Sequence, residues 1–403
     1  MGDFLPYLDE NFSASNDEKE KEMEKKLNYT LMHKNIPVVD IFLSEKGSLI
    51  LEIGEIYNPE RSPLLSGGVD IEGINLWWHL RSIPLSRDGL NKALHILNVD
   101  SPKELLEKSL GLSLSDHYWI MPKGASLKWE DVNFFHNDFS DDVGMALLGN
   151  EPMDKEHLSL TSPDNTSDGV LRKRWFISEG KRILMKGVKG YFQQEPFNEV
   201  VSSGLLHKLN INHVPYTLYL KEEKPYSLCE NFVTPLTELI PAWYIRNASP
   251  QKEGETKYTH FIRCCEKLEV PDVQDFLDRM LTFDYIIANE DRHWGNFGFI
   301  REAETLKFKG CFPIFDNGTS LWHDTENVGK EVMSLPFKNS HKKQIELVEN
   351  VSWFNSQVFN SIEEIVMPIF ALSKTINEQR AEKICNNIVI NARDIEQFKS
   401  ARR

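Results

Sequence analysis

The sequence predicts an α+β protein with two lobes, a β-rich small lobe and a mainly helical large lobe, behind an N-terminal α+β accessory domain. Three observations lead to this class. The length of 403 residues exceeds what one hydrophobic core usually organises, which favours several domains. Short stretches rich in β-branched and aromatic residues recur before residue 235. After it, apolar residues mostly follow the helical spacing of three to four positions.

The N-terminal part is divided into a charged segment, residues 1–35, and the accessory domain, residues 36–150. The charged segment contains the run DEKEKEMEKK, whose mixed charge indicates a solvated helix or a frayed tail. The accessory domain starts with the strand-like stretches VVDIFL and SLILEIGEIY and continues with helical spacing in DGLNKALHIL. Ser101 followed by Pro102 predicts the start of another helix. Four tryptophans are expected in the core of this domain, namely Trp77, Trp78, Trp119 and Trp129.

Residues 151–235 form the predicted small lobe. A polar loop without hydrophobic periodicity, EPMDKEHLSLTSPDNTSD, comes first. Between Val170 and Val233 the pattern predicts strand, strand, helix, strand and strand, with Pro196 at the start of the helix.

Residues 236–403 form the predicted large lobe. The segment PDVQDFLDRMLTFDYIIANE keeps its apolar residues three to four positions apart and predicts a long amphipathic helix. Two short strands, FGFI and FKGCFPIFD, follow as a hairpin. The tail from Ile362 to Phe398 is again helical and is expected to pack as a C-terminal bundle.

Charge and composition narrow the function classes. Lys and Arg number 46 against 61 Asp and Glu, a formal net charge of −15, so direct nucleic-acid binding is not expected. No window approaches the roughly 20 consecutive apolar residues of a spanning helix, and the first fifteen residues lack the basic and apolar parts of a secretory signal. The five cysteines form no CxxC pair and are odd in number, which favours free thiols in a reducing, cytoplasmic compartment.

The segment NEDRHWGN, residues 289–296, follows the long helix, and the hairpin then brings back Asp316 in the sequence FDNG. Transfer of a γ-phosphoryl group needs a carboxylate that accepts or orients the proton of the attacking hydroxyl. It also needs oxygen ligands for the metal ions on the nucleotide phosphates. Asp291 is the candidate for the first task, and Asn296 and Asp316 are the candidates for the second. Their joint order predicts phosphoryl transfer from ATP with Mg²⁺.

The spacing of five positions (296 − 291) from Asp291 to Asn296 also occurs in the protein-kinase catalytic loop. The order Asp-Arg-His-x-x-Asn is similar to the loop of phosphatidylinositol-type lipid kinases as well. His293 is included among the candidate catalytic residues, although hydrogen bonding within the loop is favoured for it over proton transfer. Arg292 could pair with a carboxylate or with a phosphate, and the sequence does not choose between them.

A nucleotide site of this kind also needs a strand lysine for the phosphates and a helix carboxylate that holds the lysine. Lys186 ends the strand ILMK, and Glu199 lies in the helix that follows. Lys189 is a rival for the lysine. Glu195 is the second choice for the carboxylate, because it is expected just before the helix proper.

A phosphate-covering loop should precede these strands, and the candidate is TSPDNTSDG, residues 161–169. It has one glycine, so backbone N–H groups and side-chain hydroxyls would contact the phosphates, and a plain interdomain turn is the alternative. The candidate nucleotide-binding residues in it are Ser162, Thr166, Ser167, Asp168 and Gly169. Glu230 and Phe232 end a later strand, where a hinge would bind adenine through backbone groups.

These motifs resemble those of the HipA-like kinase family, serine/threonine protein kinases of bacterial toxin–antitoxin type. The resemblance is carried by TSPDNTSDG, ILMKG, Asn198-Glu199, NEDRHWGN and FPIFDNG. It implies a bilobal, protein-kinase-like fold that uses ATP and Mg²⁺. It also implies that Asp291 is the catalytic base, that Asn296 and Asp316 are metal ligands and that Lys186 binds phosphate.

The resemblance further implies that a serine in the phosphate-covering loop becomes autophosphorylated, here Ser162 or Ser167, and that a small antitoxin-like protein restrains the enzyme. Two features depart from the family pattern. Arg292 and Trp294 stand where many members have smaller residues, and the N-terminal region is long and rich in tryptophan. Both departures bear on the choice of substrate.

The expected function is therefore ATP- and Mg²⁺-dependent phosphoryl transfer to a serine or threonine hydroxyl of a protein. One alternative is a lipid or small-molecule kinase of the phosphatidylinositol-kinase type, against which the lack of a basic membrane patch argues. The other is a nucleotide-binding pseudokinase that acts as a regulator, against which the complete set of candidate residues argues.

Overall fold

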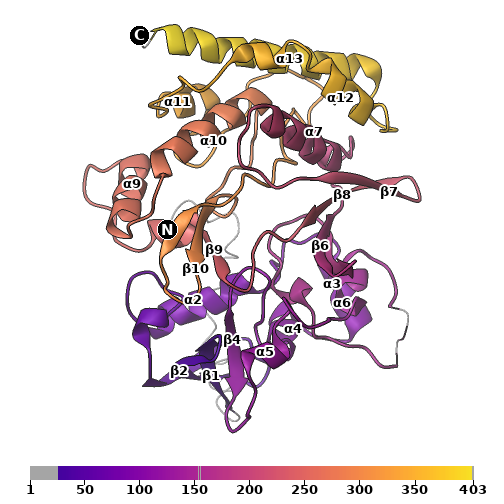
Figure 1. The fold of residues 1–403 in the computed structure, drawn as a ribbon. Coiled ribbons are helices and arrows are strands. Elements are labelled where there is room, and N and C mark those ends of the chain that lie inside the picture. Colours follow the sequence, from indigo (N-terminus) through magenta and orange to yellow (C-terminus); the bar gives the residue numbers. More distant parts are fainter. Residues whose placement is uncertain (1–25, 153, 155, 402–403) are drawn as a thin grey trace. The chain divides into compact units, whose positions relative to one another are not determined.

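The computed structural model describes residues 26–152, 154 and 156–401 (Figure 1). The charged run DEKEKEMEKK lies outside these residues, except for Lys26. The chain divides into two compact units. Unit 1 runs to Leu184 and includes Val233–Pro235, and unit 2 comprises Met185–Phe232 and Leu236–Arg403. This division falls inside the segment predicted as the small lobe, and the domain boundaries proposed from the sequence stay predictions.

Unit 1 contains an antiparallel sheet in the order β3-β2-β1-β4. Its strands are β1 (Leu27–His33), β2 (Ile36–Leu43), β3 (Ile50–Ile56) and β4 (Tyr118–Pro122). Strand β1 precedes Ile36, the expected start of the accessory domain, yet it is central in the sheet. Leu31, Val39 and Ile41 are fully buried, because one face of the sheet covers the core of the unit.

Helices surround this sheet in unit 1. They are η1 (Pro59–Arg61), α2 (Ile71–Arg81), α3 (Leu90–Leu97), α4 (Pro102–Lys108), α5 (Trp129–Val132), α6 (Asp142–Leu147) and η2 (Pro163–Thr166). The predicted helix start at Ser101 is confirmed, since its hydroxyl accepts the Glu104 N–H at the beginning of α4. The four tryptophans are at most 3% exposed, as expected for core residues. Strands β5 (Lys173–Ser178) and β6 (Lys181–Lys186) are neighbours, and the chain enters unit 2 within β6.

The first part of unit 2 contains α7 (Glu195–Lys208) and the antiparallel pair β7 (Thr217–Lys221) and β8 (Lys224–Glu230). Together with β5 and β6, this confirms the predicted order of strand, strand, helix, strand and strand. A second sheet, in the order β11-β10-β9, consists of β9 (Thr237–Pro241), β10 (Gly298–Glu302) and β11 (Phe308–Cys311). Strands β10 and β11 are the predicted hairpin, whereas β9 has no counterpart in the sequence prediction.

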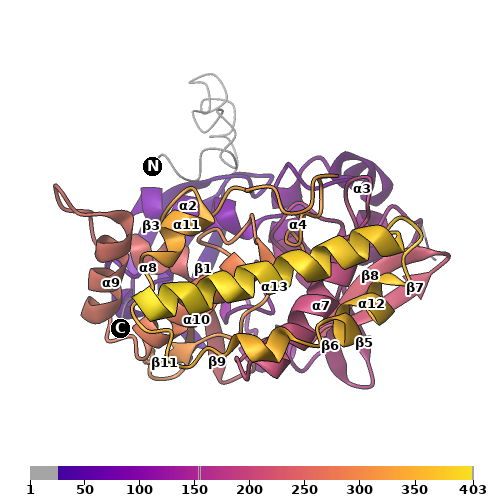
Figure 2. The same ribbon diagram turned by 90° about the horizontal axis from the view of Figure 1, so that it is seen from above.

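The rest of unit 2 is helical. Its helices are α8 (Ala242–Arg246), α9 (Lys257–Lys267), α10 (Val273–Ile287), α11 (His341–Ile345), η3 (Ser356–Phe359), α12 (Glu363–Phe370) and α13 (Glu378–Ala401). The long helix α13 lies along α10 and α12, as Figure 2 shows from above. Its buried stripe confirms the predicted C-terminal packing and consists of Ile384, Ile388, Ala392 and Ile395.

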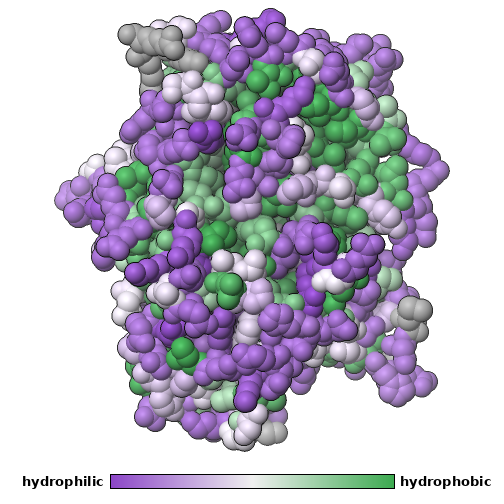
Figure 3. All heavy atoms as spheres, in the orientation of Figure 1, coloured by the Kyte–Doolittle hydropathy of each residue, from purple (hydrophilic) through white to green (hydrophobic). Residues whose placement is uncertain are grey.

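Two further properties bear on the sequence predictions. All five cysteines are free, and four of them are buried. Among the described helices, none has both the length and the apolar run that crossing a bilayer requires. In the view of Figure 3, hydrophobic residues gather over α7 and α12 of unit 2, while hydrophilic residues dominate much of the remaining face.

Candidate active site

The catalytic-loop candidate begins where α10 ends. Ala288 adopts a left-handed conformation (φ 51°), and the Asn289 N–H donates to the Asp284 carbonyl, so the chain turns back over the last helical turn. Within the loop, the backbone carbonyl of Asp291 accepts from the His293 N–H (2.8 Å) and from the Asn296 side-chain amide (2.9 Å). The amide nitrogen of Asn296 is thereby fixed, which leaves its carboxamide oxygen as the group able to coordinate a cation.

His293 lies inside the same turn. Its Nδ1 accepts a hydrogen bond from the Gly295 N–H at 3.0 Å. This contact agrees with the hydrogen-bonding role favoured from the sequence.

Arg292 resolves the choice that the sequence left open. Its side chain is 1% exposed and forms a buried pair with Asp284, with Nε and Nη2 each 3.0 Å from a carboxylate oxygen. The other donors bind the carbonyl oxygens of Asn296 (2.9 Å) and Phe315 (2.7 Å) and the side-chain oxygen of Asn317 (2.5 Å). Arg292 therefore pairs with a carboxylate, and it joins the catalytic-loop candidate to the segment that contains Asp316.

Trp294 anchors the loop on its other side. The ring is 2% exposed and packs against the rings of Phe261 and Phe337, and the Arg246 guanidinium lies 5.0 Å from its centroid. The Arg246 carbonyl in turn interacts with His260 Nε2 at 3.0 Å.

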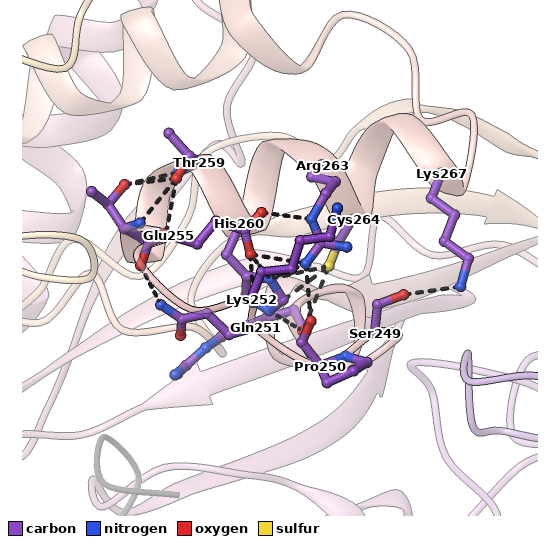
Figure 4. A network of polar contacts seen from close by, with 12 residues as sticks. Ser249, Pro250, Gln251, Lys252, Glu255, Thr259, His260, Arg263, Cys264 and Lys267 are labelled. Atoms are coloured by element: carbon purple, nitrogen blue, oxygen red, sulfur yellow. Dashed lines mark hydrogen bonds and ion pairs between the residues drawn. The ribbon is translucent and has the colours of Figure 1, made fainter.

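His260 belongs to a polar network on α9 and the turn before it (Figure 4). In this network Glu255 pairs with Arg263 at 2.6 Å, and this hydrogen bond lowers the pKa of the Glu255 carboxyl to about 2. Cys264 lies 3.9 Å from both ring nitrogens of His260 and is buried. The network fixes the turn that supports Arg246 and, through it, Trp294.

The predicted pair of lysine and carboxylate is present. Lys186 Nζ lies 2.8 Å from Glu199 Oε1 and 2.7 Å from Asp316 Oδ1. Burial alone would lower the pKa of Lys186, but the Asp316 and Glu199 carboxylates hold it well above its ordinary value. Glu199 also accepts the Asn317 N–H at 2.9 Å, so one carboxylate orients both the lysine and the backbone beside Asp316.

Tyr216 completes this cluster, and no pattern in the sequence predicted its place there. Its hydroxyl accepts from Lys186 at 3.3 Å, and its side chain is 7% exposed. Burial raises the pKa of Tyr216 well above its ordinary value, which keeps the phenol neutral. Only the fold shows that this tyrosine, which directly precedes β7, faces the lysine.

Helix α7 holds the Asp316 segment in place. The Asn198 side-chain amide donates to the carbonyls of Gly318 (2.8 Å) and Ser320 (2.7 Å). At Gly318 an added Cβ would come within 3.3 Å of the Glu195 side chain, a tight contact that favours glycine there. Asp316 itself has φ 57°, a left-handed conformation that aspartate tolerates better than most residues.

Glu195 and Lys189, the alternatives to Glu199 and Lys186, do not form the pair of lysine and carboxylate. Glu195, expected before the helix, is the first residue of α7, because Pro196 fits the first helical turn. Its carboxylate accepts the backbone N–H of Lys189 at 3.1 Å, while Glu199 is the carboxylate on Lys186. Lys189 is exposed.

The phosphate-covering candidate lies in unit 1, and its side chains are engaged with that unit. The Ser162 hydroxyl donates to Asp164 (3.1 Å), and the Ser167 hydroxyl donates to the Asp164 carbonyl (2.7 Å). Thr166 donates to the carbonyl of Leu112 (3.2 Å). Both serines are at most 8% exposed, so phosphorylation of either one requires a different loop conformation.

Arg87 clamps the end of this loop. Its buried guanidinium donates to the carbonyls of Ser167 (2.7 Å) and Gly169 (2.5 Å). Asp168 stands between Ser167 and Gly169 in the sequence, and its carboxylate accepts the Gly169 N–H at 2.6 Å. The nucleotide-binding roles of this loop stay predictions.

The hinge candidate ends β8. Glu230 is exposed, and the Phe232 ring packs 6.0 Å from those of Phe312 and Phe315. Phe315 directly precedes Asp316, so the hinge candidate and the Asp316 segment are neighbours within unit 2. Its adenine-binding role also stays a prediction.

Comparison with known proteins places these features in context. No family model matches the chain. The serine/threonine-protein kinase CtkA of Helicobacter pylori strain J99 is 26% identical over 141 residues, which are 33% of this chain and 42% of that protein. The match thus spans less than half the length of this relative.

Two solved structures are similar. HipA of Shewanella oneidensis MR-1, in complex with HipB and operator DNA, matches with a TM-score of 0.55 at 14% identity, over 90% of this chain and 96% of that chain. The crystal structure of Helicobacter pylori CtkA matches with a TM-score of 0.43 at 17% identity, over 57% and 93%.

The chain thus has an α+β, kinase-like fold, which it shares with HipA, and the predicted fold class is confirmed. The sequence similarity to CtkA and the fold shared with HipA together confirm the predicted resemblance to HipA-like kinases.

Proposed function

We propose that this protein is a kinase that transfers the γ-phosphoryl group of ATP, with Mg²⁺, to a serine or threonine hydroxyl of a protein. The observation that carries the proposal is the convergence of Lys186, Glu199 and Asp316 in unit 2, with the loop of Asp291 and Asn296 joined to them through Arg292. The partial sequence similarity to a serine/threonine-protein kinase supports it.

Each of these residues has a task in the proposed reaction. Lys186, held charged by Glu199 and Asp316, would bind the nucleotide phosphates. Asp291 would accept a hydrogen bond from the acceptor hydroxyl and orient it for attack, because its loop is fixed on both sides by Arg292 and Trp294.

The donor set fits Mg²⁺, which prefers hard oxygen ligands. Asp316 supplies a carboxylate that is 29% exposed, and Asn296 supplies a carboxamide whose nitrogen is already bonded to Asp291. Mg²⁺ would neutralise the phosphate charge that develops during transfer.

The partners are part of the proposal. HipA in its solved structure forms a complex with HipB and operator DNA. By analogy, a small regulator protein would bind this chain, whereas direct nucleic-acid contact is not proposed. The acceptor would be a protein, and the proposed compartment is the cytoplasm.

The test uses the purified full chain with γ-labelled ATP, Mg²⁺ and a mixture of acceptor proteins, followed by mapping of phosphorylated residues. Asp291→Ala and Asp316→Ala should each abolish transfer, while circular dichroism confirms that the variants are folded. Asp275→Asn, at an exposed pair with Arg279 on α10, is the matched control. Wild-type transfer in Asp316→Ala would refute the metal assignment.

The same preparation separates the alternatives. Phosphorylation of phosphatidylinositol vesicles, without phosphorylation of any protein, would replace the proposal with a lipid kinase. Nucleotide binding without transfer to any acceptor would indicate a pseudokinase.

A further inference from the structure

Several carboxylates of unit 2 form ion pairs with arginine, for example Glu238 with Arg301 (2.7 Å) and Glu255 with Arg263 (2.6 Å). Three carboxylates beside the catalytic-loop candidate differ. These three carboxylates are Glu195, Glu290 and Asp324. Among the residues that the structure describes, none of the three has a lysine or arginine within ion-pair distance.

Glu290 and Asp324 both lie next to the Asp316 segment. Glu290 directly precedes Asp291, and its backbone N–H donates to the Thr319 carbonyl at 3.0 Å, beside the Asp316 segment. Asp324 is exposed and follows the same segment. It faces Gly190, where an added Cβ would lie 3.2 Å from an Asp324 oxygen.

The backbone around Asp324 is held by a cation that forms no ion pair with it. Arg380 donates to the carbonyls of Trp322 (2.6 Å) and Thr325 (2.8 Å) and to the side-chain oxygen of Gln194 (3.0 Å). The guanidinium therefore fixes the position of Asp324 while its donors are directed to uncharged oxygens.

Glu195 supplies a second, independent observation. It is 3% exposed, Oε1 accepts the Lys189 N–H, and Oε2 is buried with no hydrogen-bond partner in the described chain. The Lys189 N–H that Glu195 accepts directly precedes Gly190, which lies beside Asp324, so both carboxylates approach the same backbone segment. Burial raises the pKa of Glu195 to about 7, and the negative charge of Asp324 acts in the same direction. A buried carboxylate oxygen without a hydrogen-bond partner is costly, and such sites are often functional.

Neither His323 nor Lys189 fully neutralises the three carboxylates. His323 Nδ1 lies 3.9 Å from Glu290, but burial lowers the pKa of His323, which keeps the ring neutral near pH 7. Lys189 is exposed, and its charge only partly offsets that of Glu195. Glu290 and Asp324 are therefore carboxylates without a lysine or arginine ion pair next to the proposed acceptor-orienting Asp291.

We propose that Glu290 and Asp324, with Glu195 behind them, form a subsite that binds the side chain of an arginine near the acceptor hydroxyl of the protein substrate. This inference rests on the proposed kinase function and names its substrate class. It assigns Glu290 and Asp324 as specificity-determining residues.

The geometry favours a guanidinium over a divalent cation. In the described part of the chain, these carboxylates do not bring three oxygens within 4.8 Å of one another, as a preformed metal site would. A guanidinium is planar and presents five N–H donors, so it can span carboxylates that are further apart.

The test uses the full chain, MgATP and synthetic peptides with one serine. At each flanking position, one peptide carries arginine and its partner carries citrulline, which has nearly the same shape without the charge. We expect one position at which arginine raises kcat/KM about tenfold over citrulline, as charged contacts at a partly exposed interface do. Glu290→Gln and Asp324→Asn should each reduce this ratio of kcat/KM at least threefold. In Asp324→Lys the preference should be inverted, so that a peptide with glutamate at that position has a higher kcat/KM than the peptide with arginine.

Glu364→Gln, an exposed carboxylate on α12, is the control and should leave the ratio unchanged. Equal kcat/KM for arginine and citrulline peptides at every position would overturn the inference while leaving the proposed function intact. A raised Mg²⁺ requirement in Glu290→Gln and Asp324→Asn, with an unchanged ratio, would also overturn it in favour of a metal site. Absence of transfer to any peptide or protein would overturn both proposals.

Discussion

Replacement of Asp284 by asparagine tests the junction on which the proposed active site depends. Asp284 is 3% exposed and accepts hydrogen bonds from Nε and Nη2 of Arg292 and from the Asn289 side chain, each at 3.0 Å. Asparagine keeps the size of the side chain but offers one acceptor oxygen, and it leaves the Arg292 charge buried without a counter-charge. Removing one partner of such a pair costs about 3–5 kcal/mol, a large part of the roughly 5–15 kcal/mol that stabilises a domain.

The matched control lies on the same helix. Asp275 and Arg279 form a pair at 2.8 Å, but the Asp275 side chain is 58% exposed, so Asp275→Asn should cost about 0.5 kcal/mol or less. Urea denaturation followed by circular dichroism measures both variants against the wild type. If the two substitutions lower the free energy of unfolding by amounts within about 1 kcal/mol of each other, the buried junction does not have the role assigned to it.

Three further predictions concern the lysine and the loop of unit 1. Lys186→Met should lower kcat/KM for phosphoryl transfer at least about 100-fold, measured with labelled ATP on protein whose melting curve shows it to be folded. Burial raises the pKa of Asp164 to about 7, so the folded state holds a proton that the unfolded state releases near pH 4. The free energy of unfolding should therefore fall by about 4 kcal/mol at most as the pH rises from about 4 to 7. Urea titrations of Asp164→Asn should show a flatter dependence on pH, and an unchanged dependence would contradict the prediction. Arg87→Met should speed amide hydrogen exchange in residues 162–169 about tenfold, and unaltered protection would show that the clamp is unnecessary.

The parts that could be predicted from the sequence depend on local patterns. The periodic apolar residues of α10 and the order of strands around α7 need no knowledge of distant contacts. The pairing of Lys186 with Glu199 followed from their places at the end of a strand and in the next helix.

Strand β9 could not be predicted in the same way. It is five residues long, and its pairing with β10 joins Ile240 to Phe299, far away in the sequence. A short segment of this kind becomes a strand because a partner edge is present, and its own residues carry little signal.

The loop of residues 161–169 shows a different limit. Hydroxyl and amide side chains can face a ligand or the protein's own backbone, and composition does not distinguish the two. In the structure Thr166 donates to the Leu112 carbonyl and the Asn165 amide donates to the Leu105 carbonyl, both in unit 1. The partners that decide the matter lie about 60 residues away, so no local pattern could reveal them.

The contacts of Arg292 also depend on residues that are distant in the sequence or on a turn that no local pattern shows. If α10 continued straight, Asp284 and Arg292 would be eight positions and about 12 Å apart along the axis. The left-handed conformation at Ala288 instead folds the loop back over the last turn, and the two side chains meet. Every nitrogen of the Arg292 side chain is then engaged with Asp284, Asn317 or a backbone carbonyl, so no donor is left for a phosphate. The arginine that departs from the family pattern therefore stabilises the catalytic-loop candidate.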